Sequence, residues 1–307
     1  MKGLYIHIPF CKSKCSYCDF YSFRPTTDDM DSYLTAVLSC IEKWGKSING
    51  GFDTIYFGGG TPSFFGGERI TKIIDKAKES FEIAKNAEIT VECNPSSVSE
   101  DLMKTLSKAG VNRISLGVQS ALTNERKMLG RASDCEQVGN AIKLAKENGI
   151  TNISLDLMLG IAGQTMQSLD QSLDFLLESD VTHISAYLLK LEEGTPLFEK
   201  KDSLPFPSED DVCDMYLHTV DRLEKAGFIQ YEISNFAKKG FESRHNTKYW
   251  KAKEYLGIGP SAHSFIDSKR FFYKRNFSAF IDGDDVIFDD LGGGEEEYVM
   301  LALRLKE

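Results

Sequence analysis

Apolar and polar residues alternate with two different periods along the first two thirds of the chain. Short runs with a period of two, typical of β-strands, are separated by longer stretches with the period of an amphipathic helix. The predicted strands are Leu4–Pro9, Thr54–Gly60, Glu88–Asn94, Arg113–Ser120, Ile153–Gly160 and His183–Glu192. The predicted helices are Asp31–Lys46, Arg69–Phe81, Glu100–Ala109, Glu136–Asn148 and Gln167–Glu178. Repeated strand-then-helix units predict a parallel sheet with right-handed crossovers.

Each predicted strand has one apolar face and one face of polar or small residues. In the first strand, for example, Ile6 and Ile8 alternate with Tyr5 and His7. A parallel strand covered by helices on both faces would be apolar throughout. The pattern therefore favours an α/β fold with an incomplete, TIM-like (β/α)6 barrel, whose helices lie outside and whose polar lumen holds a ligand. An amphipathic open sheet is the alternative.

The pattern changes after residue 204, where the sequence Leu-Pro-Phe-Pro follows. We predict a domain boundary there, with a barrel over residues 1–204 and a smaller C-terminal α+β domain over residues 205–307. Its expected elements are a helix over Glu209–Gly227, short aromatic-rich strands and loops that include Phe228–Phe236 and Phe271–Phe280, and an acidic loop over Asp289–Glu297 that leads into a last helix.

Composition narrows the function classes. The 307 residues carry a formal net charge of −10, which argues against a broad nucleic-acid-binding face. No apolar run approaches the roughly 18 residues of a membrane span. The N-terminus does not resemble a signal peptide, because Pro9 and Cys11 interrupt its short apolar stretch. We therefore expect a cytoplasmic protein, in which thiols stay reduced.

Three of the seven cysteines, Cys11, Cys15 and Cys18, lie within eight positions directly after the first predicted strand. In a reducing compartment such a group indicates metal or redox chemistry, and the polar loop around it argues against buried thiols grouped by chance. A structural zinc site is the other alternative, although such sites usually have four ligands in paired spacing. The remaining cysteines are expected to be buried and inert: Cys40, Cys93, Cys135 and Cys213.

A glycine-rich turn, Gly58-Gly59-Gly60-Thr61-Pro62, ends the second predicted strand. Glycines let the backbone approach a ligand closely. The turn lacks the Gly-Lys-Ser/Thr of a phosphate loop, and a plain turn is the remaining alternative. An ordinary [4Fe–4S] cluster uses four cysteines, so three would leave one iron open. The cysteine group and the turn together resemble the radical S-adenosylmethionine (SAM) enzymes, in which SAM binds that open iron.

Polar residues lie where the predicted strands end, which is where β/α barrels bind ligands. Glu92 and Gln119 are near the ends of the third and fourth strands, Asp156 is on the polar face of the fifth, and Arg131 follows the fourth. Carboxylates there are suited to ribose hydroxyls or an amino group, and the guanidinium to a carboxylate. The alternative is that each side chain satisfies backbone groups inside the barrel.

The order of motifs resembles the oxygen-independent coproporphyrinogen III oxidase family over nearly the whole chain. The matching segments are Tyr-Ile-His-Ile-Pro-Phe-Cys at 5–11, the glycine turn, Glu92-x-Asn94-Pro95 and Gly117-Val118-Gln119-Ser120. The resemblance implies a radical SAM barrel whose [4Fe–4S] cluster is held by Cys11, Cys15 and Cys18. It implies that the cluster-bound SAM is served by Tyr5, Gly59, Gly60, Thr61 and Glu92. Gln119, Arg131 and Asp156 match residues around a second SAM, and Tyr17 matches a Phe there.

Three departures point away from a true oxidase. Phe20 replaces a further cysteine of the oxidases, and their N-terminal extension is absent before Tyr5. The sequence from His245 to Trp250, His-Asn-x-x-Tyr-Trp, resembles the signature of HemW-type heme chaperones. The resemblance implies heme contacts by His245, Asn246, Tyr249 and Trp250, with the imidazole as axial ligand and Arg244 and Lys248 near the propionates. Spacing alone favours a different interpretation, a capped turn with a buried Trp.

The resemblance implies a heme-binding protein that transfers heme to an unidentified acceptor protein. It also implies an electron donor such as a flavodoxin or ferredoxin. The chain ends several tens of residues before most such chaperones, so we expect its C-terminal domain to be truncated. Two alternatives stay open: a coproporphyrinogen III oxidase, which decarboxylates propionates to vinyl groups, and a radical SAM enzyme with an unrelated substrate.

Overall fold

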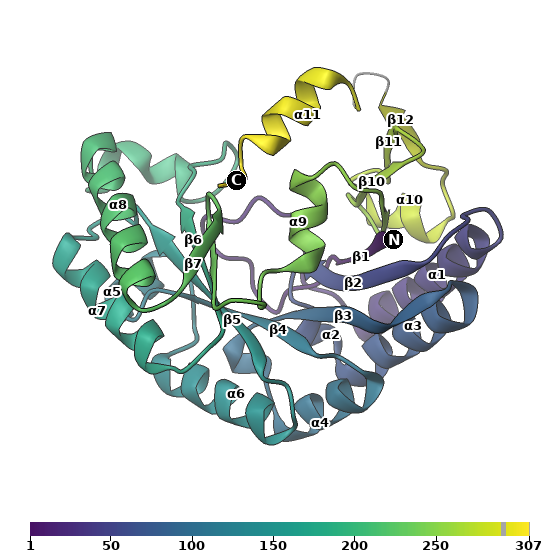
Figure 1. Ribbon diagram of the computed structural model, residues 1–307, viewed down its shortest axis with the longest axis horizontal. Coiled ribbons are helices and arrows are strands. Elements are labelled where there is room, and N and C mark those ends of the chain that lie inside the picture. Colours follow the sequence, from purple (N-terminus) through teal and green to yellow (C-terminus); the bar gives the residue numbers. More distant parts are fainter. Residues whose placement is uncertain (290–292, 307) are drawn as a thin grey trace.

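The computed structural model describes residues 1–289 and 293–306, and the twelve strands in that part form one continuous sheet. Six neighbouring strands are parallel and follow chain order, as the alternating pattern predicted. They curve into an open barrel (Figure 1). These strands are β1 (Lys2–Ile8), β2 (Phe52–Gly59), β3 (Ile83–Cys93), β4 (Arg113–Gln119), β5 (Asn152–Leu159) and β6 (His183–Leu188). The predicted α/β partial barrel is thus confirmed.

Amphipathic helices cover the convex outer face of the barrel (Figure 1). They are α1 (Thr27–Gly45), α3 (Gly67–Ser80), α4 (Glu100–Ala109), α6 (Cys135–Glu147), α7 (Met166–Glu178) and α8 (Glu209–Lys225). Capping boxes at Thr26, Asp134, Thr165 and Ser208 satisfy the first backbone N–H groups of four of these helices. The apolar strand faces, such as Ile6 and Ile55, are fully buried against them. The helices therefore leave the polar strand faces to line the lumen.

Within residues 1–204, four short elements were not predicted, because they span too few residues to show a helical period. They are α2 (Pro62–Phe65), the 3-10 turn Pro95–Ser97, α5 (Thr123–Met128) and the 3-10 segment Phe198–Ser203. The expectation of strands and loops over Phe271–Phe280 was partly wrong, since α10 (Phe277–Ile281) is a helix capped by Asn276. The predicted loop over Asp289–Glu297 includes residues 290–292, which lie outside the described residues.

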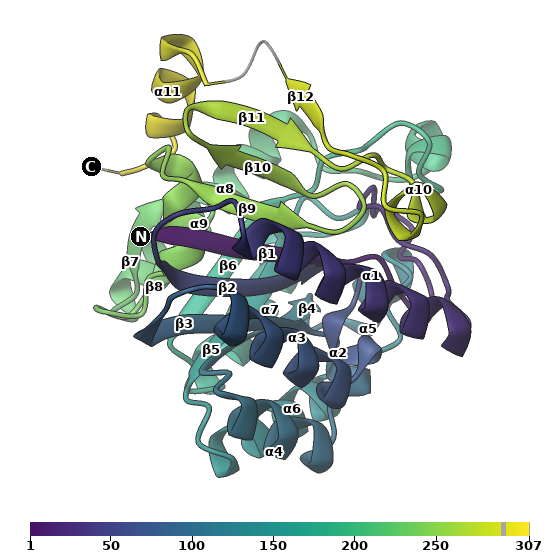
Figure 2. The same cartoon turned by 90° about the vertical axis from the view of Figure 1, so that its right-hand side faces the viewer.

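Strands from the last third of the chain extend both edges of the sheet. β9 (Tyr255–Ile258) pairs parallel with β1, and β10 (His263–Ile266), β11 (Lys269–Phe272) and β12 (Ile287–Asp289) continue antiparallel beyond it (Figure 2). At the other edge, β8 (Asn235–Ala237) and β7 (Ile229–Glu232) follow β6. The strands after residue 204 thus continue the barrel sheet, and the domain boundary there stays a prediction.

Two C-terminal helices lie on the open, concave side of the sheet (Figure 1). α9 (Arg244–Trp250) lies inside the arc, and α11 (Glu295–Ala302) crosses its opening. Ion pairs join α11 and the residues after it to strands near both edges of the sheet. Glu297 lies 2.5 Å from Arg270 on β11, and Arg304 lies 3.2 Å from Glu232 on β7. Within the described ranges, no helix has the length and apolarity needed to cross a membrane.

Candidate functional site

A cavity of about 480 Å³ opens at the carboxyl ends of the parallel strands. We call this cavity and its opening the mouth. It brings together the sequence-predicted cluster residues and all but one of the predicted SAM residues; those lining it are Cys11, Cys15, Tyr17, Cys18, Gly59, Gly60, Thr61, Glu92, Gln119, Arg131 and Asp156. Tyr5 lies deeper in the lumen, where its hydroxyl is 3.0 Å from Nδ1 of His7.

The three cysteines of the loop are free thiols on one side of the mouth. Cys11 Sγ lies 3.3 Å from the Thr61 hydroxyl, and the backbone carbonyl of Cys15 accepts a hydrogen bond at 3.3 Å from the backbone N–H of Cys18. Among the described residues, no three acidic, histidine or cysteine side chains converge on a point fit for a single metal ion. Three free thiols in one loop offer the thiolate donors that suit iron–sulfur chemistry.

The glycine turn packs tightly against His7. Gly59 has φ +106°, and a Cβ atom there would lie 2.6 Å from the His7 ring, so only glycine fits. The two ring nitrogens of His7 are within hydrogen-bond distance of Tyr5 and of the Tyr21 carbonyl. Burial lowers the pKa of His7 to about 4. A neutral His7 therefore holds the backbone of the cysteine loop.

Two carboxyl groups lie deep in the mouth. Glu92 accepts hydrogen bonds from the Tyr56 hydroxyl at 2.8 Å and from the Gly59 backbone N–H at 3.2 Å. Asp156 accepts one from the Ser115 hydroxyl at 3.0 Å. Burial raises the pKa of Glu92 to about 7 and that of Asp156 to about 6. Both groups are suited to accept hydrogen bonds from a cationic amino group or from ribose hydroxyls, which would favour the charged carboxylates.

The end of β4 departs from regular strand geometry at the mouth. Gln119 has φ +68°, and the pairing of β4 with β5 shifts register between Gly117 and Gln119. Non-glycine residues with positive φ are strained and cluster at functional sites. Arg131 crosses Gly117, where a Cβ atom would collide with it, and donates to the Gly117 carbonyl and to Cys15 Sγ at 3.7 Å. Arg131 thereby ties the cysteine loop to β4.

Several residues of the mouth were not predicted from the sequence. Ser115 and Tyr187 follow the period of two along their strands and could have been identified from that pattern. Leu188 and Lys190 carry no motif, and Phe20 was noted only as a departure from the oxidases; the curvature of the sheet brings the three to one opening. Of the remaining cysteines, which were expected to be buried, only Cys93 is; Cys40 and Cys135 are half-buried, and Cys213 is exposed on α8.

The His-Asn-x-x-Tyr-Trp motif lies at the opposite end of the lumen. It forms α9, whose first backbone N–H groups, those of Arg244 and His245, donate to Glu88 at 3.1 and 3.0 Å. His245 also contacts Gly3 and Thr54, near the amino ends of β1 and β2. We call α9 and the lumen residues beneath it the floor. Thr54 and Gly59 are five residues apart on β2, so floor and mouth are separated by roughly 16 Å.

His245 is fully buried in the floor, with both ring nitrogens in hydrogen-bonding contacts at 2.8 Å, to the hydroxyls of Thr54 and Tyr249. Its ring stacks on Tyr56 with centroids 5.1 Å apart. Burial, and to a smaller extent the nearby charges of Lys248 and Arg113, lower the pKa of His245 to about 3. In this conformation neither nitrogen is available to iron. Arg304 covers the ring of Trp250 at 4.2 Å, and Asn246 is half-buried on the same helix.

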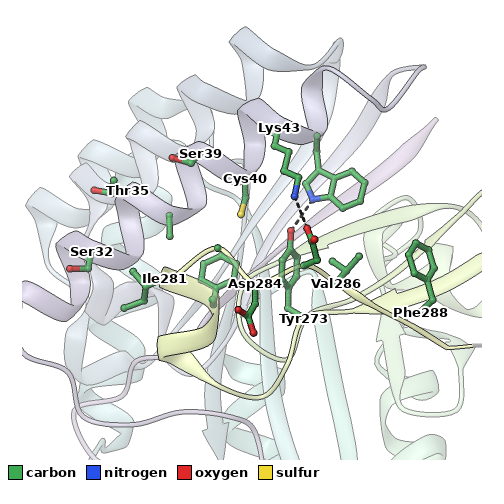
Figure 3. Close-up of a pocket in the computed structure, with 15 residues that line it drawn as sticks. Ser32, Thr35, Ser39, Cys40, Lys43, Tyr273, Ile281, Asp284, Val286 and Phe288 are labelled. Atoms are coloured by element: carbon green, nitrogen blue, oxygen red, sulfur yellow. Dashed lines mark hydrogen bonds and ion pairs between the residues drawn. The ribbon is translucent and has the colours of Figure 1, made fainter.

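A larger cavity, of about 710 Å³, lies outside the barrel between α1 and the α10–β12 segment (Figure 3). Two contacts span it: Lys43 pairs with Asp285 at 2.9 Å, and the Trp44 indole donates to the Tyr273 hydroxyl at 2.9 Å. It contains none of the residues singled out from the sequence except Cys40. The chemistry-bearing groups thus gather at the mouth.

Comparisons with known proteins show which families this chain is similar to. The model of the radical SAM superfamily matches residues 5–176. The heme chaperone HemW of Bacillus subtilis is 38% identical over 277 residues, covering 88% of this chain and 72% of that protein. HemW of Escherichia coli is 37% identical over 86% of this chain and 70% of its own length, and HemW of Mycobacterium tuberculosis H37Rv is 33% identical over 99% and 82%.

Among solved structures, the coproporphyrinogen III oxidase HemN of Escherichia coli superimposes with a TM-score of 0.81. The match covers 92% of this chain and 69% of that one, at 23% sequence identity. An identity this low supports a shared fold alone. The superposition agrees with the partial barrel and its C-terminal strands.

Proposed function

Because this chain belongs to the radical SAM superfamily and, within it, to the family of the HemW heme chaperones, we propose that it binds heme and passes it to an acceptor protein. Membership of the superfamily implies a [4Fe–4S] cluster and SAM. The observation that carries the proposal is the mouth itself, where three free thiols, a glycine turn and two raised-pKa carboxyls share one cavity. The cluster and SAM would regulate or drive transfer.

Each residue predicted to serve the cluster or SAM has a role that suits its position. Cys11, Cys15 and Cys18 would hold the cluster. Gly59, Gly60 and Thr61 would offer close backbone approach to the amino-acid end of SAM, with Glu92 accepting hydrogen bonds from its amino group and Tyr5 supporting the site from below. Gln119, Arg131, Asp156 and Tyr17 line the remaining space, where a second SAM would bind. The cluster, when bound, supplies an electron to SAM.

The partners follow from the same proposal. A protein of this kind needs an acceptor for heme and, if SAM is cleaved, an electron donor such as a flavodoxin or ferredoxin. We propose a cytoplasmic location, because free thiols at the mouth require a reducing compartment. The net charge of −10 gives no support for a nucleic-acid partner.

The test is anaerobic reconstitution followed by two assays on one sample. Iron analysis and EPR should give a [4Fe–4S] cluster, and titration with heme should give a saturable Soret shift. Zinc in place of the cluster, or no heme binding by the reconstituted protein, would contradict the proposal. Conversion of coproporphyrinogen III to protoporphyrinogen IX under reducing conditions would instead favour the oxidase alternative.

A further inference from the structure

The opening of the mouth carries three exposed apolar side chains. Phe20, in the cysteine loop, is 68% exposed, and Tyr187 and Leu188, at the end of β6, are 39% and 50% exposed. All three line the same cavity. We call them the rim. Apolar side chains that share the opening of a cavity indicate a binding site, whereas single exposed apolar residues scattered over a surface do not.

Basic side chains flank the rim. Lys14 and Lys190 are exposed and line the same cavity. Lys190 pairs with Glu192 at 2.8 Å, whereas Lys14 has no carboxylate partner within 4.0 Å among the described residues. Both lysines are close enough to lower the pKa of Asp19, after Arg275, whose hydrogen bond lowers it most. The rim therefore offers apolar contacts next to two lysines, of which Lys190 is paired with Glu192, and Asp19 lines the same cavity.

This combination fits heme, a planar apolar macrocycle with two carboxylates on one edge. Aromatic side chains pack well against flat rings, and a lysine at the border attracts a carboxylate without burying it. The floor offers no equivalent, because both nitrogens of His245 are hydrogen-bonded and its ring is fully buried beneath Tyr56. The position of Phe20, where the sequence departs from the cysteine of the oxidases, is at the heart of the rim.

We propose that heme docks on the rim, with its face against Phe20, Tyr187 and Leu188 and its propionates toward Lys14 and Lys190. This inference rests on the heme-binding function proposed above and adds where heme binds. Heme is thereby placed over the cavity of the cluster and SAM, about one barrel length from the His-Asn-x-x-Tyr-Trp motif. Occupancy of that cavity can then alter the surface on which heme sits.

The first test changes the apolar contacts. Phe20→Ser and Leu188→Glu should each lower the affinity of the reconstituted protein for heme by at least about tenfold, since each removes a large buried contact. Lys14→Glu should lower it by about threefold, and less at high salt, because an exposed charge is screened. The matched control is Leu217→Glu, a residue 63% exposed on α8, away from the cavity, which should leave heme affinity unchanged. Iron content and EPR check that each variant keeps its cluster.

The second test gives a positive signal. A Phe20→Trp variant places an indole in the rim, and heme binding should quench its added fluorescence almost completely. Leu217→Trp, on α8, should be quenched far less. The contribution of the two native tryptophans, Trp44 and Trp250, is subtracted with the unmodified protein.

The outcomes separate the two proposals. If the unmodified protein binds no heme, the proposed function fails. If it binds heme but the rim variants keep full affinity, or if position 20 is quenched no more than position 217, the rim docking is overturned. If the rim variants bind heme normally and only transfer to an acceptor is lost, the rim docks a protein and the inference is also overturned.

Discussion

The floor and the mouth occupy opposite ends of one lumen, and polar side chains serve different purposes in each. In the floor, His245 is held neutral with both nitrogens hydrogen-bonded, and Glu88 caps the helix that closes the barrel. At the mouth, Glu92 and Asp156 have pKa values raised to about 7 and about 6, and strained backbone lies at Gln119. Burial shifts the pKa of titratable groups at both ends, but the mouth adds strained backbone at Gln119 and an open cavity, and this combination marks a binding site.

Tyr56 connects the two ends. Its ring stacks on His245 in the floor, while its hydroxyl donates to Glu92 at the mouth. A motif that the sequence associates with heme is thus positioned to hold the carboxyl group proposed to serve SAM. A loss of heme binding after mutation of His245 therefore has two readings, direct ligation or a disturbed mouth, and only measurements at both ends separate them.

The largest expected effect is at the mouth. Cys15→Ser should abolish the [4Fe–4S] cluster, because a serine oxygen is a poor replacement for a thiolate ligand of iron. The matched control is Cys213→Ser on α8, whose exposed thiol lies outside the cavity. Iron analysis and EPR after anaerobic reconstitution measure the result. A full cluster in the Cys15 variant would mean that the mouth is not the cluster site.

The next largest effect is a loss of stability in the floor. Glu88 is buried, accepts hydrogen bonds from two α9 backbone N–H groups, and lies near the fully buried Arg113. Glu88→Ala leaves that charge uncompensated, so the free energy of unfolding should fall by about 3–5 kcal/mol. Urea unfolding checks this, with the exposed Glu82→Ala as control at less than about 0.5 kcal/mol. Equal effects at both positions would show that α9 is not anchored through Glu88.

Glu92→Gln should have a smaller effect of opposite sign on stability. The pKa of Glu92 in the folded protein, about 7, exceeds its ordinary value of 4.5. The contribution of protonated Glu92 to the free energy of unfolding is therefore fully present below pH 4.5 and is lost as the pH rises through 7. The variant lacks this dependence. We expect the cofactor-free variant to be more stable than the unmodified protein by about 1 kcal/mol at pH 8, after discounting for solvent in the cavity, with no gain near pH 5.

Denaturant unfolding at several pH values measures this gain, and equilibrium binding measures the expected loss of SAM affinity. Ser107→Ala, far from the mouth, is a control without a titrating group. If the difference in stability between Glu92→Gln and the unmodified protein did not change with pH, Glu92 would be charged throughout, and the contrast between the two ends would weaken.

Short-range patterns in the sequence predicted most of the barrel and of the mouth. The period of two along β1, β3 and β5 predicted which residues face the lumen, and strand ends predicted where Glu92 and Gln119 lie. The position of α9 could not be predicted, because the sequence of a seven-residue helix does not indicate which strands the helix packs against. The gathering of Phe20 and Leu188 into one rim also depends on the curvature of the sheet, which no local pattern encodes.

The smallest expected effect concerns the basic residues of α9 that the sequence associated with propionates. Arg244 and Lys248 both pair with Asp53, at 3.2 and 2.6 Å, and Arg244 also donates to the Asn86 carbonyl. Arg244 is partly exposed, so Arg244→Gln should lower the free energy of unfolding by less than about 1 kcal/mol. Heme affinity should not change, whereas Lys14→Glu at the rim should weaken it. Heme titrations of the two variants at low and high salt compare them directly. A salt-dependent loss of affinity in the Arg244 variant alone would move heme to the floor and reverse the roles assigned to the two ends.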